Sequence, residues 1–162
     1  MNHTFIIGYM FAGKTTYGRQ LAGELNIPFS DLDSLIEQRC GKTITEIFHH
    51  DGESFFRQQE HTILEELSQK AAPSVISCGG GTPCHHDNIT LMKNSGKVIY
   101  LRTPLETLFS RALKERENRP LLSNISDSDL KDFIAKQLQE REFFYLQADL
   151  IYDSQPINPI QK

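Results

Sequence analysis

The sequence predicts an α/β fold in which a mainly parallel sheet is covered by helices. Short apolar, β-branched runs alternate with longer helical patterns along the chain, which is typical of successive βα units. A glycine-rich motif stands between the first such run and the first helical pattern. With 162 residues the chain has the length of one ordinary domain, so residues 1–162 are expected to share one core.

Five short runs are predicted to form the strands. The first, 4–7, is apolar and ends at a glycine, as in a buried central strand. The others are 28–30, 75–77, 97–101 and 150–152. Their shortness and high apolar content favour a sheet that is covered on both faces.

Helical patterns fill the intervals between these runs. The first is expected over 14–25, and a second, around 35–39, stops at Gly41. Thr43 and Glu46 have the spacing of a capping box that opens a short helix, and a longer helix should follow Gly52. Two more are expected over 104–115 and 129–148. The polar segment that joins them, about 116–127, is typical of a mobile lid, and we expect the lid to span about 112–126.

Composition excludes several classes of function. A net charge of −4 offers no general attraction to nucleic acid or to an anionic membrane. No apolar stretch approaches the roughly 20 residues needed to span a bilayer, and the N-terminus lacks the pattern of a secretory signal. The three cysteines are too few and too scattered for a disulfide framework. We therefore expect a cytoplasmic protein, a monomer, without nucleic-acid or membrane partners.

The glycine-rich motif is a complete phosphate-binding loop. Residues 8–15 read Gly-Tyr-Met-Phe-Ala-Gly-Lys-Thr, which matches G-x-x-x-x-G-K-[ST] between a predicted strand and a predicted helix. Its backbone N–H groups and the helix start should bind phosphate, while Lys14 reaches the β- and γ-phosphates and Thr15 binds Mg²⁺. The alternative is a solvent-exposed glycine-rich turn.

The motif by itself predicts a nucleotide but leaves the acceptor open. Switch-type GTPases should also carry N-K-x-D and D-x-x-G runs, and neither string occurs in the sequence. This favours a metabolic kinase, which holds its acceptor in line with the γ-phosphate and excludes water.

Four further runs give the chain its resemblance to the shikimate kinases. They are Asp31-x-Asp33, Phe56-Arg57-x-x-Glu60, Gly79-Gly80-Gly81 and Arg119-Pro-Leu-Leu, in the order and at the intervals of that family. The resemblance covers essentially the whole chain. It implies a three-layer α/β/α P-loop kinase fold with a five-stranded parallel sheet of order 2-3-1-4-5. It also implies Mg²⁺-dependent transfer of the γ-phosphate of ATP to the 3-hydroxyl of shikimate.

The resemblance also assigns an acceptor site. Arg57 and Arg141 match the pair that holds the shikimate carboxylate, and planar guanidinium forks suit that group. Asp33 would accept hydrogen bonds from the ring hydroxyls and could act as a base. The remaining substrate-binding positions are Gly79, Gly80, Gly81, Phe48 and Phe56, with Met10 as a further contact.

Each assignment has a simpler structural alternative. Asp31 and Asp33 could cap the following helix, and the three glycines could form a left-handed turn. The two phenylalanines could be ordinary core residues. Glu60 could hold Arg57 in place across one helical turn, or the two could form a solvated surface pair.

The nucleotide and metal positions complete the predicted site. Lys14, Asp33 and Arg119 are the catalytic candidates. The segment around Arg119 resembles the lid of the family, which delivers an arginine to the transferring phosphate. Thr15 and Asp31 are the metal candidates. The expected nucleotide-binding residues are Gly8, Met10, Phe11, Ala12, Gly13, Lys14, Thr15, Thr16, Arg111, Arg119 and Gln155.

Two rival functions remain open at this point. A related small-molecule kinase of the gluconate kinase type would share the loop but lack the combination of Arg57, Arg141 and the triple glycine. A nucleotide-binding module without turnover is the other, because Phe11 stands where the family usually has a small residue. Cys78, Cys84, His85 and His86 do not have the spacing of a zinc site.

Overall fold

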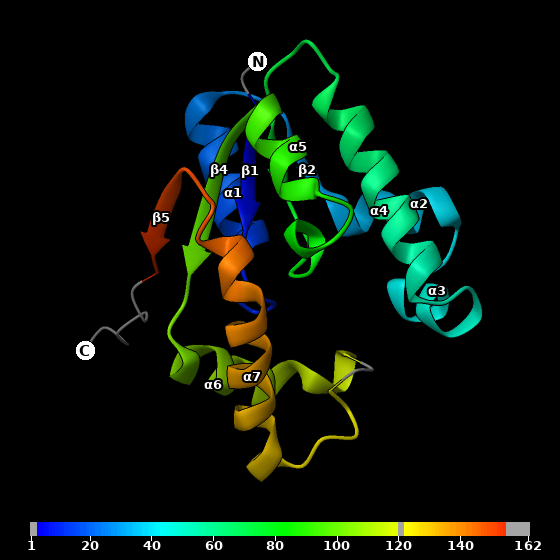
Figure 1. Ribbon diagram of the computed structural model, residues 1–162, viewed down its shortest axis with the longest axis vertical. Coiled ribbons are helices and arrows are strands. Elements are labelled where there is room, and N and C mark those ends of the chain that lie inside the picture. Colours follow the sequence, from blue (N-terminus) through cyan, green and yellow to red (C-terminus); the bar gives the residue numbers. More distant parts are fainter. Residues whose placement is uncertain (1–2, 120–121, 155–162) are drawn as a thin grey trace.

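The computed structural model describes residues 3–119 and 122–154 (Figure 1). In these residues the strands are β1 (His3–Ile7), β2 (Phe29–Asp31), β3 (Val75–Ser77), β4 (Gly96–Arg102) and β5 (Leu150–Asp153). The α-helices are α1 (Lys14–Leu25), α2 (Leu32–Cys40), α3 (Ile44–His50), α4 (Glu53–Ser68), α5 (Asn88–Ser95), α6 (Leu105–Glu115) and α7 (Asp127–Tyr145). Two 3₁₀ turns, η1 (Thr82–Cys84) and η2 (Arg116–Asn118), complete the described elements.

The five strands form one parallel sheet in the order β2-β3-β1-β4-β5. Thr4 of β1 pairs with Val75 of β3 on one side and with Lys97 of β4 on the other. Both the fold class and the strand order predicted from the sequence are thereby confirmed. In Figure 1, α2, α3 and α4 gather beside the β2 edge, and α6 and α7 lie beyond the carboxyl ends of β4 and β5.

The core explains why the central strands β1, β3 and β4 are rich in apolar residues. Phe5, Ile6 and Ile7 of β1 have no exposed surface, because helices cover both faces of the sheet. Gly18 lets α1 approach the sheet closely, since a Cβ there would lie 2.8 Å from the Phe29 ring. No helix among the described residues is long and apolar enough to cross a membrane.

Most predicted boundaries agree with the structure to within about one to three residues, and three differences have a clear physical reason. β2 is shifted by one residue and includes Asp31, whose side chain also caps α2. Helix α5 was not predicted, because residues 85–95 are largely polar and only Ile89 and Met92 mark its buried side. Helix α7 starts at Asp127 rather than 129, since Ser126 caps it, and ends at Tyr145 rather than 148.

The strand order determines where the candidate site lies in the fold. The connection after β1 runs to β2, while the connection after β3 runs in the opposite direction to β4. In open α/β sheets such a divergence between neighbouring strands leaves a crevice at their carboxyl ends. The phosphate loop follows β1 and the triple glycine follows β3, so the two motifs face each other there.

Candidate functional site

The phosphate loop joins β1 to α1 through an unusual backbone. Gly8 and Gly13 have φ angles of 148° and 88°, and Phe11 between them has φ 68°. A Cβ on Gly8 would lie 2.7 Å from the carbonyl oxygen of Leu101, so the first glycine is also required by space. The result is a tight loop at the N-terminus of a twelve-residue helix, where an anion is favoured.

Lys14 lies over this loop. Its Nζ donates to the carbonyl of Tyr9 at 2.8 Å. Burial lowers the pKa of Lys14 to about 8, and the neighbouring Asp33 carboxylate opposes that effect. A phosphate would supply the negative partner that favours the charged amine.

Thr15, the last residue of the phosphate loop, and Asp31, the last residue of β2, are the two side chains that could hold a metal ion. Thr15 Oγ1 donates to Asp31 Oδ2 at 2.8 Å, and Asp31 Oδ1 accepts from the N–H of Ser34 at 3.0 Å. Asp31 is therefore a helix cap and a neighbour of the loop at the same time. A hydroxyl and a carboxylate are the hard oxygen donors that Mg²⁺ prefers, so the residues present fit this ion.

Asp33 lies one residue inside α2 and is not its cap. Burial raises the pKa of Asp33 to about 6, with further contributions from the charges of Asp31 and Glu60, while Lys14 opposes the shift. With the loop and Gly79, Asp33 lines a cavity of about 200 Å³ that also includes Lys14. Its carboxylate thus lies between the phosphate loop and the glycine turn.

The triple glycine is needed for close approach rather than for backbone conformation. None of its residues has a positive φ, so the left-handed turn considered from the sequence is wrong. A Cβ on Gly80 would lie 3.1 Å from Arg141 Nη1, and a Cβ on Gly81 would lie 2.5 Å from Arg57 Nη2. The structure therefore brings Arg57 and Arg141 against the same turn, although 84 positions separate them in the sequence.

Each of these arginines also contacts a second side chain. Arg57 Nη1 donates to Glu60 Oε1 at 2.9 Å, and Glu60 has no exposed surface, so the solvated surface pair is wrong. The Arg141 guanidinium lies 5.6 Å from the centre of the Tyr9 ring. In residues 3–119 and 122–154, Arg141 Nη1 is the only buried side-chain nitrogen or oxygen without a hydrogen-bond partner. A buried, unpaired cationic donor beside a glycine turn suits an anionic ligand.

The two predicted phenylalanines occupy different environments. Their rings pack 4.8 Å apart, but Phe56 is only 4% exposed and belongs to the core. Phe48 lines a cavity of about 380 Å³ together with Met10, Asp33 and Arg119. Phe48 therefore lines the same cavity as Asp33, and the buried ring of Phe56 packs against the ring of Phe48.

A cavity of about 560 Å³ lies beside the phosphate loop, where the nucleotide-binding residues were predicted. Phe11, Ala12, Gly13, Thr16 and Arg111 contribute to its lining. Arg111 Nη1 donates to the carbonyl of Phe11 at 2.7 Å, and the Arg119 guanidinium lies 5.5 Å from the centre of the Phe11 ring.

Part of the predicted site lies outside the described residues. The predicted lid, 112–126, contains the end of α6, η2 and the approach to α7, but Pro120 and Leu121 are not described, and neither is Gln155.

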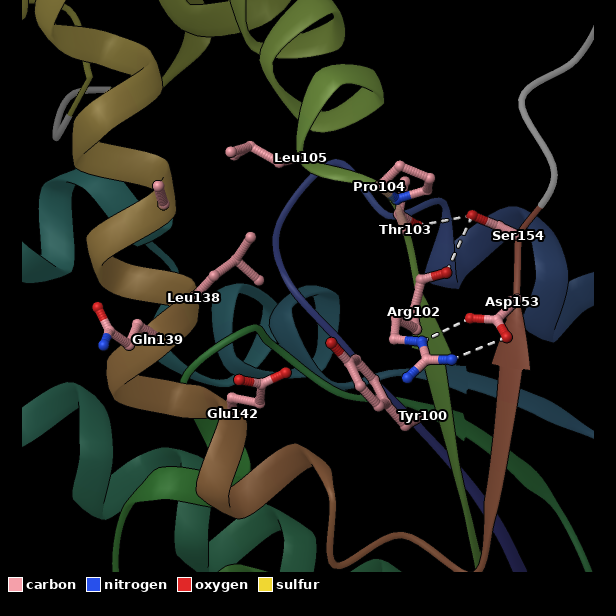
Figure 2. Close-up of a pocket in the computed structure, with 11 residues that line it drawn as sticks. Tyr100, Arg102, Thr103, Pro104, Leu105, Leu138, Gln139, Glu142, Asp153 and Ser154 are labelled. Atoms are coloured by element: carbon pink, nitrogen blue, oxygen red, sulfur yellow. Dashed lines mark hydrogen bonds and ion pairs between the residues drawn. The ribbon is translucent and has the colours of Figure 1, made fainter.

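A further cavity, of about 640 Å³, lies beside the ends of β4 and β5 (Figure 2). Arg102 and Asp153 form an ion pair on its wall, and Thr103 hydrogen-bonds Ser154. Thr103 Oγ1 also donates to the carbonyl of Ala12 at 3.4 Å, which links this wall to the phosphate loop. No motif in the sequence pointed to this cavity.

Sequence reasoning assigned no role to three residues that shape the site. Tyr9 lies under Arg141, and Tyr145 donates its hydroxyl proton to the carbonyl of Gly80 at 2.6 Å. Thr82 donates to buried Glu60 at 2.7 Å. A signal existed only for Tyr145, which follows Arg141 by one helical turn and so shares its face.

Comparison with known proteins gives a consistent result. A family model described as shikimate kinase matches residues 10–161. The shikimate kinase of Azobacteroides pseudotrichonymphae is 45% identical over 152 residues, covering 94% of this chain and 89% of that protein. The crystal structure of the enzyme from Bacteroides thetaiotaomicron has 40% identity and a TM-score of 0.90, covering 98% of this chain and 90% of that one. A shikimate kinase from Acinetobacter baumannii, solved in complex with shikimate, has 34% identity and a TM-score of 0.87, covering 96% and 85%. The chain belongs to the shikimate kinase family.

Proposed function

We propose that this protein transfers the γ-phosphate of ATP to the 3-hydroxyl of shikimate, giving ADP and shikimate 3-phosphate. The observation that carries the proposal is the pair of guanidiniums, Arg57 and Arg141, that contact one glycine turn across from the phosphate loop. A ligand that is an anion at one end and carries hydroxyls at the other matches this arrangement, and shikimate has that chemistry. The solved complex of the Acinetobacter baumannii enzyme with shikimate supports the same acceptor.

The acceptor would be held at both ends. Arg141 Nη1 has no protein partner, so a carboxylate oxygen would satisfy it, while Arg57 would add a second fork fixed by Glu60. Asp33, on the loop side of the glycine turn, would accept hydrogen bonds from the ring hydroxyls. We assign Asp33 to orientation first and to proton removal second, because phosphoryl transfer through a loose transition state needs little base catalysis.

The donor phosphates would lie on the loop. Lys14 and Arg119 would face the charge that develops on the transferring group, and such fixed charges lower the barrier most where water is excluded. Thr15 and Asp31 would hold Mg²⁺, which, when bound, neutralises phosphate charge. Arg111 and Phe11 would border the nucleoside.

An acceptor panel tests the proposal. ADP release should be measured with shikimate, gluconate and nucleoside monophosphates, each with and without Mg²⁺. Release that depends on shikimate is expected. Turnover of gluconate alone would support the other kinase type, and bound ATP without acceptor-dependent ADP release would support a regulatory module.

Arg57→Ala tests the acceptor assignment directly. Loss of the fork should raise the KM for shikimate at least roughly tenfold while leaving ATP affinity unchanged. Arg39→Ala is a matched control, because Arg39 pairs with Glu66 on the exposed surface of α2 and α4. Normal shikimate kinetics in Arg57→Ala would overturn the assignment.

The proposal also covers the domain organisation, oligomeric state and cellular location of the enzyme. We assign residues 1–162 to one domain that acts as a cytoplasmic monomer. The cysteines at 40, 78 and 84 are all free thiols, which agrees with a reducing compartment.

A further inference from the structure

Thr82 occupies a position that the proposed function does not explain. It follows the glycine turn directly, begins η1 and has no exposed surface. Its hydroxyl donates to Glu60 Oε2 at 2.7 Å. A buried hydroxyl aimed at a buried carboxylate is a specific contact, because both groups lost water to form it.

Glu60 connects Thr82 to the acceptor site. Its other oxygen, Oε1, accepts from Arg57 Nη1 at 2.9 Å. The two oxygens therefore have different partners, one on α4 and one after the glycine turn. If the Thr82 hydroxyl were lost, Oε2 would be buried without its donor, and the carboxylate would be free to rotate toward another one.

The backbone of Thr82 is fixed by a second contact. Asn88 Nδ2 donates to the carbonyl of Thr82 at 2.9 Å, and Asn88 Oδ1 lies 2.7 Å from Nδ1 of His61. Because a carbonyl can only accept, the Asn88 amide orientation is determined, so Oδ1 must accept and His61 Nδ1 must carry the hydrogen. His61 follows Glu60 on α4, so the chain of contacts starts and ends on one helix.

We propose that Thr82 is a positioning residue that sets the orientation of Arg57 through Glu60. It touches no substrate itself. The inference rests on the proposed function, in which Arg57 holds the carboxylate of the acceptor. Since the contact lies on the acceptor side of the crevice, its loss should affect the acceptor and leave the nucleotide unaffected.

The variant pair Thr82→Val and Thr82→Ser tests this proposal. Valine keeps the shape and removes the hydroxyl, whereas serine keeps the hydroxyl. We expect Thr82→Val to raise the KM for shikimate by roughly tenfold to a hundredfold with an unchanged KM for ATP. Thr82→Ser should stay within about twofold of the wild type, since its hydroxyl can still reach Glu60.

An acceptor without a carboxylate charge distinguishes a loss of Arg57 positioning from a general loss of order in the glycine turn. The methyl ester of shikimate lacks the carboxylate charge that Arg57 would bind. The wild type should prefer shikimate over the ester, and Thr82→Val should lose most of that preference. If Thr82→Val raised the KM for both acceptors equally, Thr82 would have only a structural role and the inference would be wrong.

A variant that does not fold and a wild type that is inactive must both be distinguished from a failure of the inference about Thr82. If Thr82→Val does not fold, as judged by circular dichroism, Thr82→Ala replaces it with the same expectation, because it too lacks the hydroxyl. If the wild type fails to phosphorylate shikimate, the proposed function itself is overturned. An active wild type with an unaltered acceptor preference in the hydroxyl-free variant would overturn the role of Thr82 alone.

Discussion

Gly81 and Arg57 are in direct contact: a Cβ on Gly81 would lie 2.5 Å from Nη2 of Arg57 and 3.0 Å from Nη1. Gly81 has φ −94°, so an alanine could adopt its backbone conformation without strain. Glycine is therefore required at position 81 by the nearby guanidinium of Arg57 and not by the backbone conformation. The position of the guanidinium depends on this glycine.

Gly81→Ala should displace Arg57 while the fold persists. We expect the KM for shikimate to rise roughly tenfold or more and the KM for ATP to stay the same, in steady-state assays with each substrate varied. Gly23→Ala is the matched control, because no atom lies within 4 Å of the Cβ it adds. Equal shikimate kinetics in the two variants would contradict the contact.

Arg141→Leu should separate binding from stability. Arg141 Nη1 is buried without a partner, so removing the guanidinium takes away an unsatisfied donor. The free energy of unfolding, measured with urea, is expected to stay equal or increase, whereas the KM for shikimate should rise at least roughly tenfold. A large loss of stability would show that the contact of Arg141 with the Tyr9 ring outweighs its unsatisfied donor.

Asp33→Asn should make stability less dependent on pH. The folded-state pKa of about 6 lies above the ordinary 3.8, so Asp33 contributes stability below about pH 4 that is lost as the pH rises through 6. At neutral pH the ionised carboxylate is therefore destabilising. The variant should gain on the order of 1–3 kcal/mol near pH 7 and nothing near pH 4, in urea titrations without nucleotide or metal. An equal gain at both pH values would contradict this origin, and catalysis should be lost in either case.

Phe11 should store backbone strain. Its φ of 68° lies in the left-handed region, which costs a residue with a side chain about 1 kcal/mol. Phe11→Gly and Phe11→Ala both remove the ring and differ only in the Cβ atom. The glycine variant should therefore be more stable than the alanine variant by about 1 kcal/mol in chemical denaturation. Alanine at least as stable as glycine would exclude strain at this position.

Arg119→Ala should lower kcat far more than it changes either KM. A side chain that meets charge only in the transition state contributes mainly to the chemical step, and its loss typically costs about 10²- to 10³-fold. Single-turnover measurements would separate that step from product release. A variant with normal kcat and raised KM for ATP would instead assign Arg119 to nucleotide binding.

The parts that could be predicted from sequence are those encoded locally. The phosphate loop is a contiguous motif, and the apolar runs of β1, β3 and β4 follow from burial on both faces. Strand order came from the resemblance, since no local pattern specifies which strands become neighbours.

Contacts between distant segments were out of reach. Arg57 and Glu60 could be recognised as a pair one turn apart, but their spacing could not show that Thr82 would cover the carboxylate. Nor could it show that Gly79–Gly81 would be limited by neighbouring side chains instead of by φ. Helix α5 was missed for a related reason: its polar residues Asn88 and Ser95 are buried, so the apolar period is weak.

The bond from Tyr145 to Gly80 has a practical consequence. The chain has five tyrosines and no tryptophan, so its intrinsic fluorescence comes from tyrosine alone. Tyr145 is anchored to the glycine turn, and Tyr9 lies beneath Arg141 with its hydroxyl bonded to Gln137. Two of the five emitters thus contact the glycine turn or Arg141, so binding of an acid at these residues is expected to change the tyrosine fluorescence of the unlabelled protein.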